Sequence, residues 1–507
     1  MRMTSRNRLF HRRSIAIGLL CAYVFTALSI SASGIPTAEA ATGNVGIWLD
    51  QVGSQLATTS FAKFPFTGVG SEERNDGIYT YNTVTSDVTI AEAGNYLILG
   101  YIRYSDTSNG RANWQTRVTV NGSPVSGSYG YGMLRNSNNN EGFVRNAAIV
   151  HVVASDIVAL EWRRDSDAGA GGTVAGLSSF TIVRLPDDDR AAYAHYGTPT
   201  GSAFTGTTWT DLTGLDVIRE TDTSAIELQT GGNNIRLKHA NRTYLIIYGL
   251  PFNTSNGQRT QRIGRAVSGS TEIPQSNSYF YSRNASNEYG ALYNMFLYRT
   301  TAANEDISIQ AQRGSADVNG TTTMMTASGE AGVFVMELPV TAETFISDDD
   351  VGAQDVSQNG LNATLNLMRN VRHSDSASFT KEGAGHDTMR VEKRMDILVT
   401  AACRVLRTDT SGTRLTLGAR FTIEGVTQDR GRHGTYVRGN QSTTDTYNGS
   451  INPAGIFSVV QNDSIQVEAF DAGDDGSNDA TVGGSCGFGA LNLDSLFRKR
   501  HFFFWLY

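Results

Sequence analysis

The sequence lacks an excess of positive charge and, beyond its first 40 residues, any long apolar run. It has 42 Lys and Arg against 49 Asp and Glu, for a formal net charge of −7. An acidic surface argues against nucleic acid as a partner, because that affinity comes mostly from Lys and Arg that neutralise phosphates. The same charge argues against an anionic lipid surface. No later segment is long enough to span a bilayer, which takes about 20 apolar residues.

Familiar catalytic motifs are also missing. The sequence has no His-Glu-x-x-His and no phosphate-binding Gly-x-x-x-x-Gly-Lys, and we expect no nucleophile elbow. Its eight histidines share no metal-ligand spacing, and His433 is expected in a solvated loop. We therefore predict no catalytic residue and no cofactor.

Carboxylate pairs leave one enzymatic alternative open. Glu161 with Asp165, or Glu468 with Asp471, could serve glycosidic cleavage, since the carboxylate separation of about 5–10 Å is set by folding and is invisible in the sequence. Most exposed acids serve no such purpose, so a carbohydrate-acting enzyme remains the alternative to a binding protein.

Residues 1–40 are typical of an export signal. Five arginines precede the apolar stretch Ile15–Ile30, and Thr37–Ala40 offers a small-x-small cleavage site. Because the apolar stretch is short for a membrane span, we predict that residues 1–40 are removed. Five arginines and Glu39 leave with them, so the formal charge becomes −11 (−7 − 5 + 1). The mature protein is then secreted or displayed at the cell surface.

What the sequence does contain is one long unit that occurs three times. The closing strands carry Phe180, Phe334 and Phe488, which are 154 residues apart both times (334 − 180 and 488 − 334). Solenoid repeats are only about 20–50 residues long, so this period indicates tandem domains. We predict domains over residues 41–186, 187–340 and 341–496, followed by a basic and aromatic tail over 497–507.

Further landmarks keep the same order in each copy. They are an apolar strand, a hairpin that leads to an arginine, and an aspartate that opens an alternating strand; the arginines are Arg117, Arg265 and Arg420, and the aspartates Asp156, Asp306 and Asp463. Short alternating runs separated by Gly, Asn, Asp and Ser are typical of β-strands. The fold class predicted from them is all-β.

Three segments of the first copy resemble the jelly roll of the tumour necrosis factor and complement globular-head superfamily. They are Gly94–Ile98, Ser155–Leu160 and Ser179–Leu185. The resemblance implies about eight strands in two sheets per copy, and hence three tandem jelly-roll β-sandwiches. Copies two and three depart from the pattern where their apolar strand begins, with Arg242 and Arg394 near the place of Gly94.

The resemblance also implies threefold trimers that meet through aromatic-rich faces. The three copies could accordingly pack as an intrachain pseudo-trimer. The alternative is an extended rod, because the short acidic linkers Pro186–Arg190 and Pro339–Asp350 serve either arrangement. A homo-oligomer is also open.

Two cysteines remain after cleavage, Cys403 and Cys486. In a jelly roll their strands would be antiparallel neighbours, so the end of one meets the start of the other. Export permits a disulfide, and we predict a structural Cys403–Cys486 bridge. Two separate buried thiols are the alternative.

Oxygen donors in the third copy suggest a calcium site. Asp471, Asp474, Asp475 and Asp479 lie within nine residues, and carboxylates are preferred Ca²⁺ ligands. The run departs from the EF-hand pattern, because Gly473 and Val482 occupy ligand positions. A solvated loop is the alternative.

Aromatic residues cluster in the first two copies and could form a ligand platform or the faces where copies pack. They are Tyr129, Tyr131, Tyr279, Phe280, Tyr281, Tyr289, Tyr293, Phe296 and Tyr298. Aromatic residues in strands usually bury area, which favours packing. Recognition would then be carried by the loops.

These observations predict a secreted, non-enzymatic protein of binding or structural type, with a protein or glycan as its ligand. A carbohydrate-acting enzyme on a β-sandwich is the alternative from another class. A fibre or virion component is a third, against which the export signal weighs.

Overall fold

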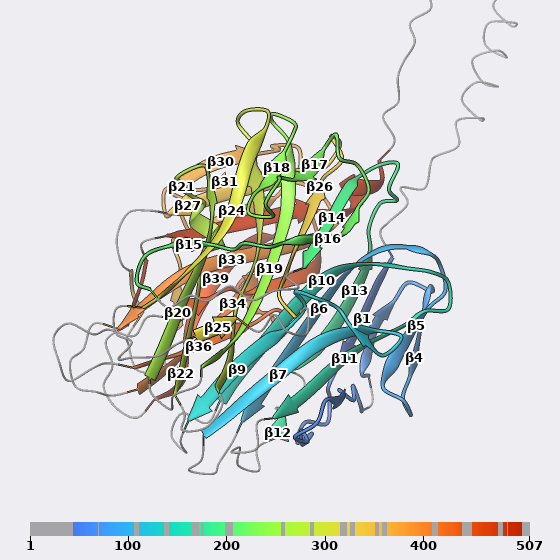
Figure 1. Ribbon diagram of the computed structural model, residues 1–507, viewed down its shortest axis with the longest axis vertical. Coiled ribbons are helices and arrows are strands. Elements are labelled where there is room, and N and C mark those ends of the chain that lie inside the picture. Colours follow the sequence, from blue (N-terminus) through green and yellow to red (C-terminus); the bar gives the residue numbers. More distant parts are fainter. Residues whose placement is uncertain are drawn as a thin grey trace, which may run out of the picture. The chain divides into compact units, whose positions relative to one another are not determined.

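The alternating pattern produces antiparallel strands throughout the described part of the chain, as a computed structural model shows (Figure 1). The structure describes residues 44–498 except 69, 106–110, 136–140, 165–171, 174–176, 198–205, 255–258, 284–287, 315–321, 325–329, 350–353, 357–361, 408–413, 439–448, 475–479 and 484. The predicted signal and residues 499–507 of the tail lie outside this part. Within it, no helix is both long and apolar enough to cross a membrane.

Residues 45–184 form the first pair of sheets. One sheet has the order β10-β6-β13-β1-β3, with β12 on β6, and the other β4-β5-β11-β7-β8, with β2 on β11 and β9 on β7. The strands are β1 (Val45–Leu49), β2 (Ala62–Lys63), β3 (Glu72–Asn75), β4 (Tyr79–Asn82), β5 (Asp87–Ile90), β6 (Gly94–Ser105), β7 (Arg111–Val120), β8 (Ser123–Pro124), β9 (Gly130–Arg135), β10 (Glu141–Val152), β11 (Ile157–Arg164), β12 (Gly172–Thr173) and β13 (Ser179–Arg184).

Residues 192–337 form the second pair. Its sheets have the orders β16-β14-β26-β19-β23, with β25 on β19, and β17-β18-β24-β20-β21, with β15 on β24 and β22 on β20. The elements are β14 (Ala192–Gly197), β15 (Thr210–Asp211), β16 (Asp216–Glu220), β17 (Ile226–Leu228), β18 (Ile235–Leu237), β19 (Thr243–Thr254), β20 (Arg259–Ser268), β21 (Thr271–Glu272), the 3-10 turn η1 (Pro274–Ser276), β22 (Ser278–Arg283), β23 (Glu288–Arg299), β24 (Glu305–Arg313), β25 (Thr322–Met324) and β26 (Gly332–Glu337).

Residues 344–492 form the third pair. Its sheets have the orders β28-β40-β33-β41-β27-β30, with β37 and β38 on β33, and β31-β32-β39-β34-β35, with β29 on β39 and β36 on β34. The elements are β27 (Thr344–Asp349), β28 (Gln354–Asp355), β29 (Ala363–Thr364), β30 (Asn370–Ser374), β31 (Phe379–Glu382), β32 (Thr388–Val391), β33 (Met395–Arg407), β34 (Arg414–Ile423), β35 (Val426–Thr427), β36 (His433–Arg438), β37 (Gly449–Ile451), β38 (Ala454–Val459), β39 (Ser464–Asp474), β40 (Ala480–Val482), β41 (Cys486–Asn492) and the 3-10 turn η2 (Leu493–Phe497).

The three pairs share one strand order and are here called the first, second and third sandwich. In each, the first strand pairs with the last, and the last with the long apolar strand: β1-β13-β6, β14-β26-β19 and β27-β41-β33. The facing sheets repeat the orders β5-β11-β7, β18-β24-β20 and β32-β39-β34. The all-β sandwich fold predicted from the sequence is confirmed.

The predicted equivalence of Phe180, Phe334 and Phe488 is wrong by one residue for Phe334. Phe180 and Phe488 pair with Gly100 and Ala401, each four residues beyond Tyr96 or Ile397 in the apolar strand. Phe334 pairs with Ile247, only three residues beyond the corresponding Tyr244. A one-residue shift turns a strand side chain to the opposite face. Val333 therefore occupies the core position, and Phe334 faces out of its own sandwich.

The sandwiches contact one another in a head-to-tail cycle. A turn of the first sandwich places Gly127 against Gly332 of the second sandwich. The Gly127 N–H donates to the Glu330 carbonyl of the second sandwich at 2.7 Å. The equivalent turn of the second places Gln275 against Gly487 of the third. In the third, Arg430 and Gly431 adjoin Tyr101, Ser179 and Thr181 of the first. Such contacts close into a ring.

We call the sheets that contain β6, β19 and β33 the inner sheets, and the sheets that face them the outer sheets. The inner sheets pack against one another through the faces that point away from their own sandwiches. A single apolar cluster joins Leu97 of the first sandwich, Leu245 and Phe334 of the second, and Leu398 and Ile456 of the third, all at most 2% exposed. Of the two arrangements open to the sequence, the described residues adopt the compact one.

Substitution at Gly249 is expected to weaken the first contact in this cycle. A Cβ there would lie 2.1 Å from the Gly127 carbonyl oxygen, so Gly249→Val must separate two backbones. We expect unfolding to become easier by about 1–3 kcal/mol, the usual cost of overpacking, seen as a lower Tm. In the control Gly206→Ala, the new Cβ meets nothing nearer than 3.7 Å. Equal Tm values for the two variants would contradict the close packing.

Candidate functional site

A groove lies at the boundary between the first and second sandwiches. Its volume is about 440 Å³, and its walls are the β7–β9 connection and the end of β10 on one side and β14 and β16 on the other. Apolar side chains such as Val125, Ile149 and Ile218 alternate with Ser126, His151 and Arg219. Concave surfaces that combine apolar walls with a few polar groups are typical of binding sites.

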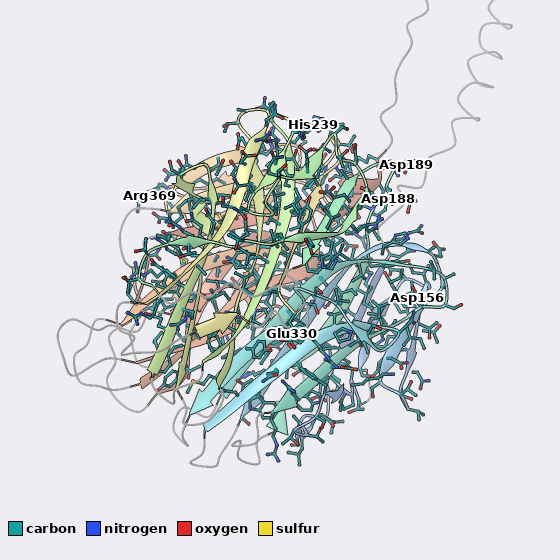
Figure 2. All side chains as sticks on the ribbon, in the orientation of Figure 1. Asp156, Asp188, Asp189, His239, Glu330 and Arg369 are labelled. Atoms are coloured by element: carbon teal, nitrogen blue, oxygen red, sulfur yellow. A yellow bond between two sulfur atoms is a disulfide. The ribbon has the colours of Figure 1, made fainter. Side chains whose placement is uncertain are left out.

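Arg219 fixes one wall of the groove. Its Nη2 donates to both carboxylate oxygens of Asp188 at 2.7 and 2.8 Å, and its Nη1 donates to the Asn95 Oδ1 at 2.9 Å. Asn95 belongs to the first sandwich, while Asp188 is in the linker between the two (Figure 2). These bidentate, charge-assisted bonds hold the linker and both sandwiches in one geometry.

His195 lies on the floor of the groove. Its Nε2 donates to the Ser126 carbonyl at 3.0 Å, and its ring stacks on Phe334 with the centroids 4.2 Å apart. Burial lowers its pKa to about 4, assisted by the positive charge of Arg219. The imidazole is therefore neutral at physiological pH, and it forms a rigid part of the floor.

Strand β16 exposes aliphatic side chains at the groove. Ile218, which lines the groove, is 52% exposed, and Val217 next to it in sequence is 51% exposed. β16 is the outermost strand of its sheet. Natural proteins usually protect such edges with charge or short length, so consecutive exposed aliphatic residues here mark a surface suited to contact.

A second hollow, of about 650 Å³, lies beside the two linkers and is lined by charged and apolar side chains in similar numbers. Glu337 accepts from the Tyr244 hydroxyl at 2.6 Å and pairs with His239 at 2.9 Å, and Arg242 lies 3.7 Å from it. Asp188, which is labelled with Asp189 and His239 in Figure 2, is held by Arg219. Glu337 and Asp188, which line this hollow, are therefore both paired with basic side chains.

The carboxylates considered for glycosidic cleavage are engaged in cross-strand ion pairs. Glu161 lies opposite Arg117 with an N–O distance of 2.7 Å, and Glu468 lies opposite Arg420 at 3.1 Å. In the second sandwich the same position holds Gln310, which accepts from Arg265 at 2.9 Å. Asp165 lies outside the described residues, as does the side chain of Asp471. The repeated pair has a structural role in each outer sheet.

A Gly-x-Ser-x-Gly sequence does occur, at residues 483–487, contrary to our expectation of none. It links strand β40 to strand β41, whereas a nucleophile elbow joins a strand to a helix. The Ser485 hydroxyl donates to the Glu272 carboxylate at 2.9 Å. The motif forms a contact between the third and second sandwiches.

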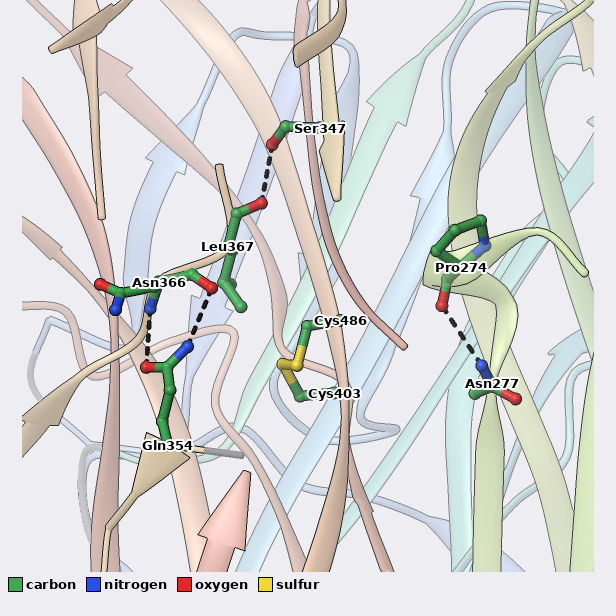
Figure 3. Close-up of a disulfide and its surroundings, with 8 residues drawn as sticks. All are labelled: Pro274, Asn277, Ser347, Gln354, Asn366, Leu367, Cys403 and Cys486. Atoms are coloured by element: carbon green, nitrogen blue, oxygen red, sulfur yellow. Dashed lines mark hydrogen bonds between the residues drawn. A yellow bond between two sulfur atoms is a disulfide. The ribbon is translucent and has the colours of Figure 1, made fainter. Parts of the chain in front are cut away.

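Cys403 and Cys486 form a disulfide (Figure 3). Ala402 pairs with Gly487 across β33 and β41, so the two cysteines stand opposite each other with Cα atoms 4.2 Å apart. Both are 1% exposed, consistent with a structural bridge.

The predicted calcium ligands fall largely outside the described part. Asp475 and Asp479 are not described, and Asp471 and Asp474 are described only as backbone of β39. Among the described residues, no group of three or more His, Cys, Asp or Glu could hold a metal ion. The calcium site stays a prediction.

The aromatic clusters pack between strands and sandwiches. Tyr129, Tyr131, Phe280, Tyr281, Tyr293 and Phe296 are at most 9% exposed. The Tyr281 ring stacks on Tyr436 of the third sandwich with the centroids 5.6 Å apart. Packing is therefore their role in the described structure, rather than a ligand platform.

Sequence reasoning missed the groove itself. Its two walls come from different copies, and nothing along the chain joins Ser126 to His195. The one available signal was the apolar pair Val217-Ile218 in an otherwise charged strand.

Comparison with known proteins finds solved structures that match part of the chain. No family model and no curated protein matches the chain. The structure of Eiger TNF from S. frugiperda matches 29% of this chain and 94% of its own, with 17% identity and a TM-score of 0.23. Murine APRIL structures at pH 5.0 and pH 8.0 match 29% of this chain and 100% of their own, with 10% and 12% identity and TM-scores of 0.22. Each match spans about one sandwich in length.

Acid is expected to destabilise the protein through His195. Its pKa is about 4 in the folded state and about 6.5 when unfolded, so the unfolded chain binds the proton first as pH falls. The free energy of unfolding should therefore decrease between pH 6.5 and 4, by up to about 3 kcal/mol from this residue. His195→Gln, which can still donate to Ser126, should show a smaller decrease in denaturant titrations at several pH values. An identical pH dependence in variant and wild type would refute the assignment.

Loss of the disulfide should destabilise the third sandwich. The cysteines are 83 residues apart in sequence, and a bridge closing so long a loop contributes about 2–5 kcal/mol. The double variant Cys403→Ala/Cys486→Ala should unfold at a lower Tm than the oxidised wild type. Reductant should lower the Tm of the wild type and leave that of the variant unchanged. A wild type insensitive to reductant would count against the bridge.

Proposed function

We propose that this chain is an exported, non-enzymatic binding protein that recognises a protein or glycan ligand outside the cell. The observation that carries the proposal is the groove between the first and second sandwiches. It combines a volume of about 440 Å³ with fixed polar groups and an exposed aliphatic edge. Binding sites are usually preformed in this way.

The rigidity of the groove supports recognition. Arg219 is fixed by Asp188 and Asn95, and His195 by Ser126 and Phe334. A ligand that enters pays little for ordering these walls, which favours affinity.

Export underlies the proposed location. The expected signal over residues 1–40 directs the chain out of the cell, where a disulfide such as Cys403–Cys486 persists. The described carboxylates of the enzymatic alternative are committed to Arg117 and Arg420, so no specific observation favours catalysis.

Binding should depend on the exposed aliphatic side chains of strand β16. Labelled mature protein, residues 41–507, would be applied to a glycan array and to an array of extracellular proteins. We expect at least one ligand whose affinity falls tenfold or more in Ile218→Arg, because the new charge must be desolvated against an apolar contact.

The matched control is Val426→Arg, which alters an equally accessible aliphatic residue, 63% exposed, on the third sandwich. It should bind like the wild type. Binding unaffected by Ile218→Arg would refute the groove as the site. Release of new reducing ends from a bound glycan would show an enzyme instead.

A further inference from the structure

A small cavity lies where the three sandwiches meet, and we call it the central cavity. Its volume is about 40 Å³. Strands β9 and β10 of the first sandwich, β22 and β23 of the second, and β34, β36 and β37 of the third supply its walls. One water molecule needs roughly 10–15 Å³, so the cavity has room for a single small ion with one or two waters.

The central cavity contains a buried cation. Arg145 of β10 is 5% exposed. Its Nη1 donates to the Asn452 carbonyl of the third sandwich, and its guanidinium lies 5.3 Å from the centre of the Tyr293 ring of the second. Its Nη2 has no hydrogen-bond partner within the described part of the chain. Burial lowers the pKa of this guanidinium, against a smaller opposing contribution from Tyr293.

Among the residues that the structure describes, the lining offers no carboxylate to neutralise this cation. These lining residues are apolar, aromatic, hydroxylic or basic, with no Asp or Glu among them. Arg432, which is similarly buried at 6% exposed, is by contrast paired with Asp429. A buried charge without a counter-ion costs several kcal/mol, so the unpaired guanidinium calls for an anion.

His433 supplies a second donor. Contrary to the solvated loop expected from the sequence, it lies in β36 and lines the central cavity. Its Nδ1 accepts from the Asn452 N–H at 3.0 Å, so in the neutral ring the proton is on Nε2. Burial and the charge of Arg145 lower its pKa to about 3, which keeps the ring neutral and this tautomer in place.

We propose that the central cavity binds one chloride-sized anion, held by the Arg145 guanidinium and the Nε2–H of His433. A monatomic anion neutralises the guanidinium and fits the volume. A tetrahedral oxyanion would also need room for four oxygens, and chloride is the abundant small anion outside cells. Because the walls belong to three sandwiches, the bound ion links all of them and stabilises the assembled chain.

Thermal stability tests the proposal directly. Tm of the mature protein would be measured over a chloride series, with bulky methanesulfonate replacing chloride at constant ionic strength. Tm should rise with chloride, because a ligand that binds only the folded state stabilises it by RT ln(1 + [L]/Kd). Each tenfold increase above Kd then adds about 1.4 kcal/mol. No difference between the two anions would overturn the proposal.

Variants separate the site from general salt effects. Arg145→Met should abolish the chloride dependence and can raise Tm in methanesulfonate, because replacing an unpaired buried charge is often stabilising. Arg117→Met, which removes an arginine paired with Glu161 outside the central cavity, should retain the dependence. A chloride response in Arg145→Met equal to that of the wild type would refute the assignment.

Crystals of the wild type grown in bromide give a readout that needs no variant. An anomalous peak within hydrogen-bonding distance of Arg145 is expected. Water alone at that position would overturn the proposal. Neither outcome bears on ligand binding in the groove, so the two proposals fail independently.

Discussion

Burial of the outward faces of three inner sheets against one another is the constraint on which the rest of this structure depends. Leu97, Leu245 and Leu398 would form exposed apolar patches if each sandwich stood alone. Together they form one buried cluster, and the turns around Gly127, Gln275 and Gly431 close the ring. Covalent linkage supports this arrangement, because the three sandwiches belong to one chain and do not have to associate from separate molecules.

The same packing creates both proposed binding sites. Where the first and second sandwiches adjoin, they leave the groove that is lined by His195 and Arg219. Where all three meet, strands from each enclose the central cavity around Arg145. The surface groove offers apolar contact to a large ligand, whereas the interior offers one uncompensated charge to a small anion.

Much of the architecture could be predicted from local patterns. The hairpin arginines Arg117, Arg265 and Arg420 do occupy one repeated cross-strand position. The motif spacing nevertheless misplaced Phe334 by one residue, because two registers one apart give equally apolar sequences in a strand buried on both faces. His433 was misjudged for a related reason: charged neighbours suggested a loop, while the structure has a strand facing the central cavity.

The sequence by itself determined an all-β chain and the order of its repeated landmarks, because these follow from alternation and recurrence along the chain. The pairing of Cys403 with Cys486 was expected only through the jelly-roll resemblance, which makes their strands neighbours. Only the tertiary structure decided the head-to-tail ring, the groove and the central cavity. Each of these joins residues from different copies, such as Ser126 with His195 or Arg145 with Asn452. Contacts between copies leave no periodic pattern in a sequence, since they depend on the shape complementarity of the folded sandwiches.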